Sequence, residues 1–307
     1  MLRNFFYLVC CFLFLSAAVN ADSVLRTEKL AEGVYALVGP LTNRDAVNLG
    51  NNANFGVIVT DAGVVLIDPG ATVKGAKMIH AAIAKLTDKP VTWVINSGGQ
   101  DHRWLGNHYF KTQGATIIAS EKAVADQKGR LQSQLNRLSA LMGDEELQGI
   151  TPVHADETFP DEKILTIGNK RIEIYHAGHA HTPGDSFIWL PEDKIVFTGD
   201  IVYMDRMLGI GAMSKHLEWI NTFEAMAKLK PQIVVPGHGQ PADLKKAKQD
   251  SYDYLVFIRN AVMEFMDEGY GMEEIGSIDQ SRFSYLVNYE SLKGRNAQRV
   301  FEELEWE

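Results

Sequence analysis

Cysteine is nearly missing from this 307-residue sequence, and its absence limits the sites that the chain can build. The only two, Cys10 and Cys11, lie in an apolar run near the N-terminus, residues 5–15. Residues 22–307 contain none, so that part of the chain forms neither a disulfide bond nor a thiolate metal site. Metal ligands there would come chiefly from histidine and carboxylate side chains.

Long apolar runs are also missing outside this N-terminal stretch. Arg3 precedes the run, and small residues close it at residues 19–21. This arrangement is typical of a secretory signal peptide, and the run is too short to favour a membrane span. We therefore expect a signal peptide over residues 1–21, a periplasmic or secreted protein, and no membrane contact after cleavage.

Basic residues are fewer than acidic ones. Lysine and arginine number 30 against 39 aspartates and glutamates, a formal net charge of −9 at pH 7. Such a balance disfavours nucleic acid as a partner. Length and a hydrophobic content of 46% suit one large domain with an appendage. We predict this domain over residues 22–241 and a helical extension packed on it over residues 242–307; the oligomeric state stays open.

Apolar periodicity alternates between strand and helix along the chain. It predicts strands at residues 34–38, 55–60, 64–68, 91–96, 164–167, 171–175, 186–190, 195–198 and 233–235. It predicts helices at residues 74–86, 104–112, 120–142, 217–229 and 242–267, with a helical remainder to residue 307. Two similar halves of strands and covering helices indicate an α/β fold, a four-layer αβ/βα sandwich.

Polar residues gather in five loops that follow predicted strands. Loops at one edge of a layered α/β sheet converge on one cleft. Histidine and carboxylate side chains that meet there suit a hydrolytic metal site with one position left for water. These loops are residues 67–70, 96–103, 178–185, 198–200 and 235–239.

The order and spacing of four of these loops resemble the metallo-β-lactamase superfamily of metallohydrolases. The motifs that carry the resemblance are Asp68-Pro69-Gly70, His181-Thr182-Pro183-Gly184-Asp185, Gly199-Asp200 and Gly237-His238-Gly239. It extends over roughly residues 30–240 and implies the sandwich fold and metal-dependent hydrolysis.

The resemblance also implies a role for one residue of each motif. His181 would be a ligand of the first metal, His238 a ligand of the second, and Asp200 the carboxylate that bridges both metals. Asp68 would lie behind the ligands and orient them by accepting hydrogen bonds.

The C-terminal residues carry a second resemblance. Asp279-Gln280, Tyr289-Glu290 and residues 295–303 look like the C-terminal helices of periplasmic members of this superfamily. Those members include proteins grouped with sulfur-oxidation and quinoprotein systems.

The loop at residues 95–104, INSGGQDHRW, departs from the family. The family's metal loop reads His-x-His-x-Asp-His, after Asn-Thr or Asn-Ser and before Gly-Asn. The flanking pairs are present as Asn96-Ser97 and Gly106-Asn107. An alignment without gaps then puts Gly98 and Gln100 in place of the first two histidines, His102 in place of the aspartate, and Arg103 in place of the last histidine.

An alignment with a one-residue gap gives a different result. Asp101 and His102 then take the places of the Asp-His pair, and the second metal keeps Asp101, His102 and His238, with Asp200 alongside. The first metal keeps His181, with Gln100 as a weak neutral substitute. We prefer the alignment without gaps because it keeps both flanking pairs, and the alternative stays open here.

Both alignments keep His102 and point to a site for one metal. Three imidazoles and a carboxylate suit Zn²⁺ first and also Fe or Mn. Asp101 would be either a further ligand or a general base. The expected ligands are His102, His181, Asp200 and His238.

Arg103 is the second unusual residue of this loop. Its guanidinium would repel a second cation, and with Gln100 it could bind an anionic group of the substrate. The alternative is that Arg103 forms a structural salt bridge.

The sequence thus predicts an exported metallohydrolase with a reduced, mononuclear site. Metal-activated water, oriented by Asp101 or Asp200, would attack an ester, a thioester or a related small substrate. The missing first-metal ligands argue against β-lactam hydrolysis. Two alternatives remain: a small-molecule-binding protein that has lost its metal, and an oxidoreductase with iron at the His/Asp cluster.

Overall fold

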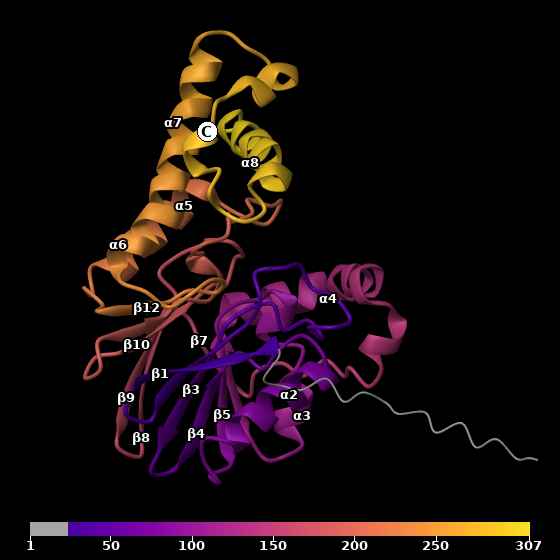
Figure 1. The fold of residues 1–307 in the computed structure, drawn as a ribbon, viewed down its shortest axis with the longest axis vertical. Helices are drawn as coiled ribbons and strands as arrows, with labels where there is room; N and C mark the ends of the chain where they lie inside the picture. Colours follow the sequence, from indigo (N-terminus) through magenta and orange to yellow (C-terminus); the bar gives the residue numbers. More distant parts are fainter. Residues whose placement is uncertain (1–23) are drawn as a thin grey trace, which may run out of the picture.

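The computed structural model describes residues 24–307, so the signal peptide expected at residues 1–21 lies outside the described residues. Two β-sheets pack face to face, and helices cover their outer faces (Figure 1). The α/β sandwich predicted from the sequence is therefore confirmed.

The first sheet has seven strands in sequence order, antiparallel from β1 to β4 and parallel from β4 to β7. Its strands are β1 (Arg26–Ala31), β2 (Val34–Val38), β3 (Phe55–Thr60), β4 (Gly63–Ile67), β5 (Val91–Asn96), β6 (Thr116–Ser120) and β7 (Glu157–Phe159). The second sheet has the order β12-β11-β10-β9-β8, in which only β11 and β12 are parallel. Its strands are β8 (Glu162–Ile167), β9 (Lys170–Tyr175), β10 (Phe187–Leu190), β11 (Ile195–Phe197) and β12 (Ile233–Val235).

Helices α2 to α4 follow strands of the first sheet, α5 lies between β11 and β12, and α6 to α8 follow β12. The α-helices are α2 (Val73–Ala84), α3 (Asn107–Lys111), α4 (Glu121–Met142), α5 (His216–Ala227), α6 (Leu244–Ala247), α7 (Asp253–Asp267) and α8 (Tyr289–Leu304). Short 3₁₀ segments are η1 (Asp101–Arg103), η2 (Asp144–Leu147), η3 (Gly199–Ile201), η5 (Met272–Ser277) and η6 (Ser281–Phe283), and η4 (Lys248–Tyr252) is a π-helical turn.

Strand alternation divides the apolar side chains between two cores. On β4, Val65 faces the second sheet and packs with Ile174 and Ile188, whereas Leu66 faces α2 and packs near Ile79. Successive side chains of a strand point to opposite faces, so strands covered on both faces are apolar at nearly every position. This explains why the central strands were readable from sequence as apolar runs.

Three strands were not predicted. β1 is polar and largely exposed at the edge of the sheet, and β7 has only three residues, so neither carries an apolar signal. β6 ends at Ser120, which caps α4 by accepting a hydrogen bond from the Ala123 amide, so strand and helix run together in the sequence. The long helix predicted at residues 242–267 begins at Leu244 and is interrupted by the π-helical turn.

The C-terminal helices share a core with the second sheet. Figure 1 shows α7 and α8 together at one end of the molecule, beyond the strands. Trp219 of α5, Tyr254 of α7 and Val300 of α8 are buried in the same cluster as Val196 and Val234 of the sheet. Within residues 24–307, no helix combines the length and the apolar character that crossing a membrane requires.

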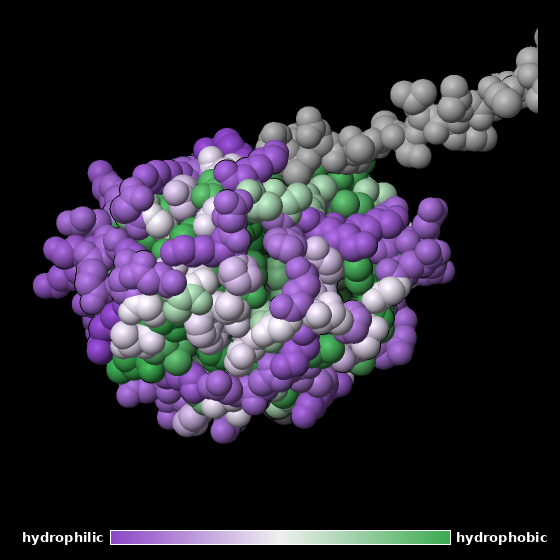
Figure 2. Space-filling view, turned by 90° about the horizontal axis from the view of Figure 1, so that it is seen from below, coloured by the Kyte–Doolittle hydropathy of each residue, from purple (hydrophilic) through white to green (hydrophobic). Residues whose placement is uncertain are grey.

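The opposite end of the molecule is shown in Figure 2. Hydrophilic side chains surround it, and hydrophobic residues lie in separate areas between them. Hydrophilic side chains therefore make up much of the surface at this end of the molecule.

Asn296 fixes α8 to the segment that follows η3. Its buried amide group donates to the Leu208 carbonyl at 2.8 Å, and its carbonyl oxygen accepts from the Ile210 amide at 2.8 Å. A buried side chain that satisfies two backbone groups sets the position of a helix along its axis.

Asn296→Ala should therefore lower the free energy of unfolding by roughly 2–3 kcal/mol, because two buried backbone groups lose their partners. Urea denaturation followed by circular dichroism measures this loss. Gln298→Ala, an exposed position on the same helix, is the control and should change stability by less than about 0.5 kcal/mol. Equal effects of the two substitutions would contradict the assignment.

Candidate active site

The polar loops meet at one edge of both sheets. Asp68 follows β4, residues 97–103 follow β5, Asp200 follows β11 and His238 follows β12. β4 and β5 are parallel, as are β11 and β12, so their carboxyl ends lie at the same edge.

Backbone contacts join the loops across the two sheets. The Asn54 amide donates to the Gly237 carbonyl at 2.8 Å, and the Ser186 amide donates to the Ser97 carbonyl at 2.7 Å. A Cβ at Gly237 would lie 2.4 Å from the Gly199 carbonyl oxygen and 2.6 Å from the Arg103 Nη2 atom. Glycine at 237 therefore lets the last loop approach the guanidinium.

Arg103 lies at the centre of this edge, and only 1% of its surface is exposed. Its Nε and Nη2 donate to the two oxygens of Asp200 at 3.2 and 2.8 Å. Its Nη1 donates to Asp68 at 2.9 Å and to the Asn54 carbonyl at 3.1 Å, and Nη2 also donates to the Gly237 carbonyl at 3.3 Å. All five N–H groups of the guanidinium are used.

This geometry corrects the prediction that Arg103 binds substrate. The side chain is buried and has no donor left for a ligand, so the alternative prediction, a structural salt bridge, describes it. Two buried carboxylates hold the guanidinium in its charged form and raise its pKa further, against the opposing effect of burial.

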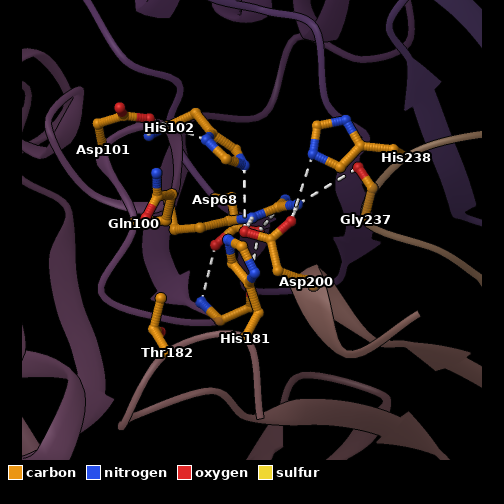
Figure 3. A network of polar contacts seen from close by, with 12 residues as sticks. Asp68, Gln100, Asp101, His102, His181, Thr182, Asp200, Gly237 and His238 are labelled. Atoms are coloured by element: carbon orange, nitrogen blue, oxygen red, sulfur yellow. Dashed lines mark hydrogen bonds and ion pairs between the residues drawn. The ribbon is translucent and has the colours of Figure 1, made fainter. Parts of the chain in front are cut away.

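His102, Asp200 and His238 form a group whose donor atoms lie within 4.8 Å of one another. The Nε2 atoms of His102 and His238 each lie 3.3 Å from an oxygen of Asp200. Figure 3 shows the two imidazole rings directed at Asp200 from different loops. The buried Nε2 of His102 has no hydrogen-bond partner among residues 24–307.

Nδ1 of His238 donates to the Asn52 carbonyl at 2.8 Å, which leaves its Nε2 unprotonated. Nδ1 of His102 contacts both the carboxylate of Asp101, at 2.9 Å, and the guanidinium of Arg44. A cation between the two Nε2 atoms and Asp200 would have imidazole and carboxylate ligands. The donor set thus fits a metal ion.

The charge states agree with this. Burial lowers the pKa of His238 well below its usual value, so the ring is neutral near pH 7. Burial alone would raise the pKa of Asp200, but the guanidinium of Arg103 holds it well below its usual value. Neutral imidazole and ionised carboxylate are the forms that bind metal. Tyr203 donates to Asp200 at 3.1 Å and stacks on His238, which fixes both groups.

Asp101 does not join the metal group. Its carboxylate accepts from Nδ1 of His102 and pairs with Arg44 at 2.6 Å, on the side of the ring away from Asp200 (Figure 3). Burial would raise its pKa, but Arg44 and His102 lower it, so it stays ionised. The prediction of Asp101 as a ligand is corrected: it orients His102 as an outer carboxylate.

His181 lies beside the group and is outside it. Its Nδ1 donates to the Gly209 carbonyl at 3.1 Å, and burial lowers its pKa to about 4, so Nε2 is again unprotonated at pH 7. No donor atom of His181 is close enough to complete a four-residue group with the other three. It lines the adjoining cavity instead.

The other predicted residues support the centre from behind or from the side. Asp68 accepts from the Ser97 amide and hydroxyl, each at 2.7 Å, and from Arg103, so it orients Asp200 through the guanidinium. Gln100 lines the cavity and accepts from Arg130 at 3.2 Å. A Cβ at Gly98 would lie 2.5 Å from a carboxylate oxygen of Asp185, so this position has no room for a ligand side chain.

The geometry agrees with the alignment without gaps. His102 and Arg103 both reach Asp200, and the side chains of Asn96 and Asn107 bind each other through two 2.9 Å hydrogen bonds across the loop. Sequence reasoning missed Tyr203 and Arg44, which belong to no motif. Their roles arise only where separate loops come together.

The sequence model of the metallo-beta-lactamase superfamily matches residues 49–238. The chain is similar to a metallo-beta-lactamase type 2 of Pseudomonas aeruginosa, with 26% identity over 253 residues that cover 81% of this chain and 92% of the relative. The protein of the same name from Elizabethkingia meningoseptica is 26% identical over 207 residues, which cover 66% of this chain and 75% of the relative.

Solved structures share the fold. A metallo-beta-lactamase from Pontibacter korlensis superimposes with a TM-score of 0.60 at 21% identity and covers 76% of this chain and 99% of its own. The sec-alkylsulfatase Pisa1 from Pseudomonas sp. superimposes with a TM-score of 0.72 at 19% identity. That match covers 92% of this chain and 50% of the sulfatase, so this chain spans about half of that enzyme.

Arg103→Met should lower the free energy of unfolding by about 3–5 kcal/mol, because it leaves Asp68 and Asp200 as buried, unpaired carboxylates. Urea denaturation in the presence of a chelator measures this loss without a contribution from metal. The loss should shrink as the pH falls from neutral towards 5, since protonated carboxyl groups need no counter-charge.

Arg171→Met, which removes an exposed arginine paired with Glu173, is the matched control. It should change stability far less than Arg103→Met does, because water already screens the pair between Arg171 and Glu173. A similar loss of unfolding free energy in both variants would show that the buried ion pairs of Arg103 stabilise the protein no more than an exposed pair does.

Proposed function

Because the chain belongs to the metallo-β-lactamase superfamily, we propose that it is a metal-dependent hydrolase with a single-metal site. The observation that carries the proposal is the unpartnered, buried Nε2 of His102 facing Asp200, with the Nε2 of His238 beside it. His102, Asp200 and His238 would hold the ion, and His181 lies next to it. The histidine-rich donor set favours Zn²⁺, with Fe or Mn as alternatives.

Arg103 supports the choice of one metal. Its fixed positive charge lies 2.8 Å from Asp200 and would repel a second cation there. The positions of the family's first-metal histidines hold Gly98 and Gln100, and Gly98 has no space for a side chain. The carboxylate of Asp200 keeps lone pairs for one metal beside the guanidinium.

The chain's own residues have distinct tasks in this proposal. A divalent ion, when bound, supplies Lewis-acid activation of water and of the scissile group. Asp101 and Arg44 fix the ring of His102, and Arg103 and Tyr203 fix Asp200. Asp200 orients the attacking water, a task that Asp101 cannot share because it lies behind His102. The substrate class that we propose is an ester, a thioester, or a sulfur- or phosphorus-centred ester.

Metal content tests the site. Protein purified from a periplasmic fraction, with Asp22 as its first residue if the expected signal is cleaved, should contain about one metal ion per chain after mild reconstitution. His102→Ala and His238→Ala should each lose most of it, whereas His108→Ala, on α3 and outside the group, should not. Less than about 0.2 metal per chain in the unsubstituted protein would favour the metal-free binding protein instead.

Hydrolysis tests the reaction. Against a panel of carboxylic, thiol, sulfate and phosphate esters, activity on at least one class should disappear with a chelator and return with metal. Asp200→Asn should lower kcat/KM by about 100-fold or more if Asp200 orients water. Activity that survives chelation and the loss of metal in His238→Ala would overturn metal-dependent hydrolysis.

A further inference from the structure

A cavity of about 340 Å³ adjoins the metal group. The residues that line it include His102, His181, His238 and Tyr203. Among the described residues that line it there are four arginines and no aspartate or glutamate. The four are Arg44, Arg137, Arg206 and Arg295.

These arginines come from distant parts of the chain. Arg44 lies in the loop between β2 and β3, Arg137 on α4, Arg206 after η3 and Arg295 on α8. In a chain of net charge −9, four guanidinium groups around one small cavity are a local reversal of charge. Such a reversal creates a positive potential in the cavity and attracts anions.

Three of the four have no carboxylate partner. Arg44 is neutralised by Asp101 at 2.6 Å. Arg206 donates only to neutral groups, the Thr42 carbonyl at 3.1 Å and the side-chain oxygen of Asn43 at 3.2 Å, and its buried Nε has no partner among residues 24–307. The side chains of Arg137 and Arg295 form no hydrogen bond or ion pair with any described residue.

The positive charges also oppose one another. Burial lowers the pKa of Arg137, and the neighbouring charges of Arg44 and Arg295 lower it further. Burial lowers the pKa of Arg206 too, and Arg44 and Arg137 add to the effect. An arrangement that brings like charges together is stabilised when an anion binds between them.

We propose that this cavity binds an anionic group of the substrate, with Arg137, Arg206 and Arg295 as its partners. The ligand is a small organic molecule that carries a carboxylate, sulfate or phosphate group, whose oxygens match the guanidinium geometry. Leu141, Met207 and Leu292 also line the cavity and leave it room for a short hydrocarbon part. That the ligand is the substrate rests on the proposed function; the anion site itself rests on the cavity alone.

The proposal gives the helical extension a role in the site. Arg295 is contributed by α8, and its neighbour Asn296 fixes that helix against Leu208 and Ile210. The extension then supplies a binding residue to the domain that carries the metal group.

Anion binding is measured by calorimetry with inorganic phosphate, sulfate and succinate as probes, on metal-loaded and chelator-treated protein. We expect one site for at least one probe in both forms, with an affinity that falls as salt rises, because salt screens the charges of Arg137 and Arg295, which reach solvent. The preferred probe identifies the type of anionic group. If neither form binds any of the three probes, the proposal is overturned.

The double variant Arg137→Gln/Arg295→Gln should weaken binding tenfold or more, since each charged hydrogen bond that is lost costs about that factor. Lys128→Gln/Lys293→Gln is the matched control, because it removes the same charge from the same two helices outside the cavity. The control should stay within twofold of the unsubstituted protein. Equal weakening in both double variants would show a general charge effect and overturn the site.

Asp200→Asn separates this inference from the proposed function, because Asp200 belongs to the metal group and is not among the residues that line the cavity. It should weaken metal binding, lower hydrolysis by about 100-fold or more and keep the anion affinity of chelator-treated protein within about threefold. Loss of hydrolysis with retained anion binding supports the site whatever the reaction proves to be. Loss of anion binding in a variant that retains the circular dichroism spectrum of the unsubstituted protein would count against it.

Discussion

The buried contact between Arg103 and the carboxylates of Asp68 and Asp200 is the interaction on which the rest of this site depends. It joins the loops after β4, β5 and β11, and through the Gly237 carbonyl it reaches the loop after β12. One guanidinium with five donors can satisfy acceptors from four loops at once, which an ammonium group cannot do. Because both carboxylates are buried, the charge of Arg103 is needed for the edge of the two sheets to close.

The same contact constrains the chemistry. The cation of Arg103 lowers the negative charge that Asp200 offers to a metal ion, and in the site that we propose His102 and His238 would hold one ion with it. Each residue of the metal group is held by a further contact. Asp101 and Arg44 contact His102, the Asn52 carbonyl accepts from His238, and Tyr203 donates to Asp200. Side chains fixed in this way keep their lone pairs in position before a ligand arrives, which is the usual requirement of a metal centre.

The arginine cavity and the helical extension belong together. α8 shares its apolar core with the second sheet, and the buried amide of Asn296 sets its position along that core. Arg295, one residue before it, lines the same cavity as Arg137 on α4. In the anion site that we propose, a chain of net charge −9 would present a basic cavity to a small anion.

The sequence by itself determined the sandwich fold, the central strands and the loops where polar residues gather, because apolar periodicity and strand ends are local features. His102, Asp200 and His238 could be named from their motifs for the same reason. Only the tertiary structure decided that Arg103 is a buried counter-ion and that Asp101 lies behind His102, because the direction of a side chain in a loop depends on what other loops place around it. The sequence could not predict the arginine cavity either. Its four arginines are far apart in the chain, and the packing of α4 and α8 around the site brings them together.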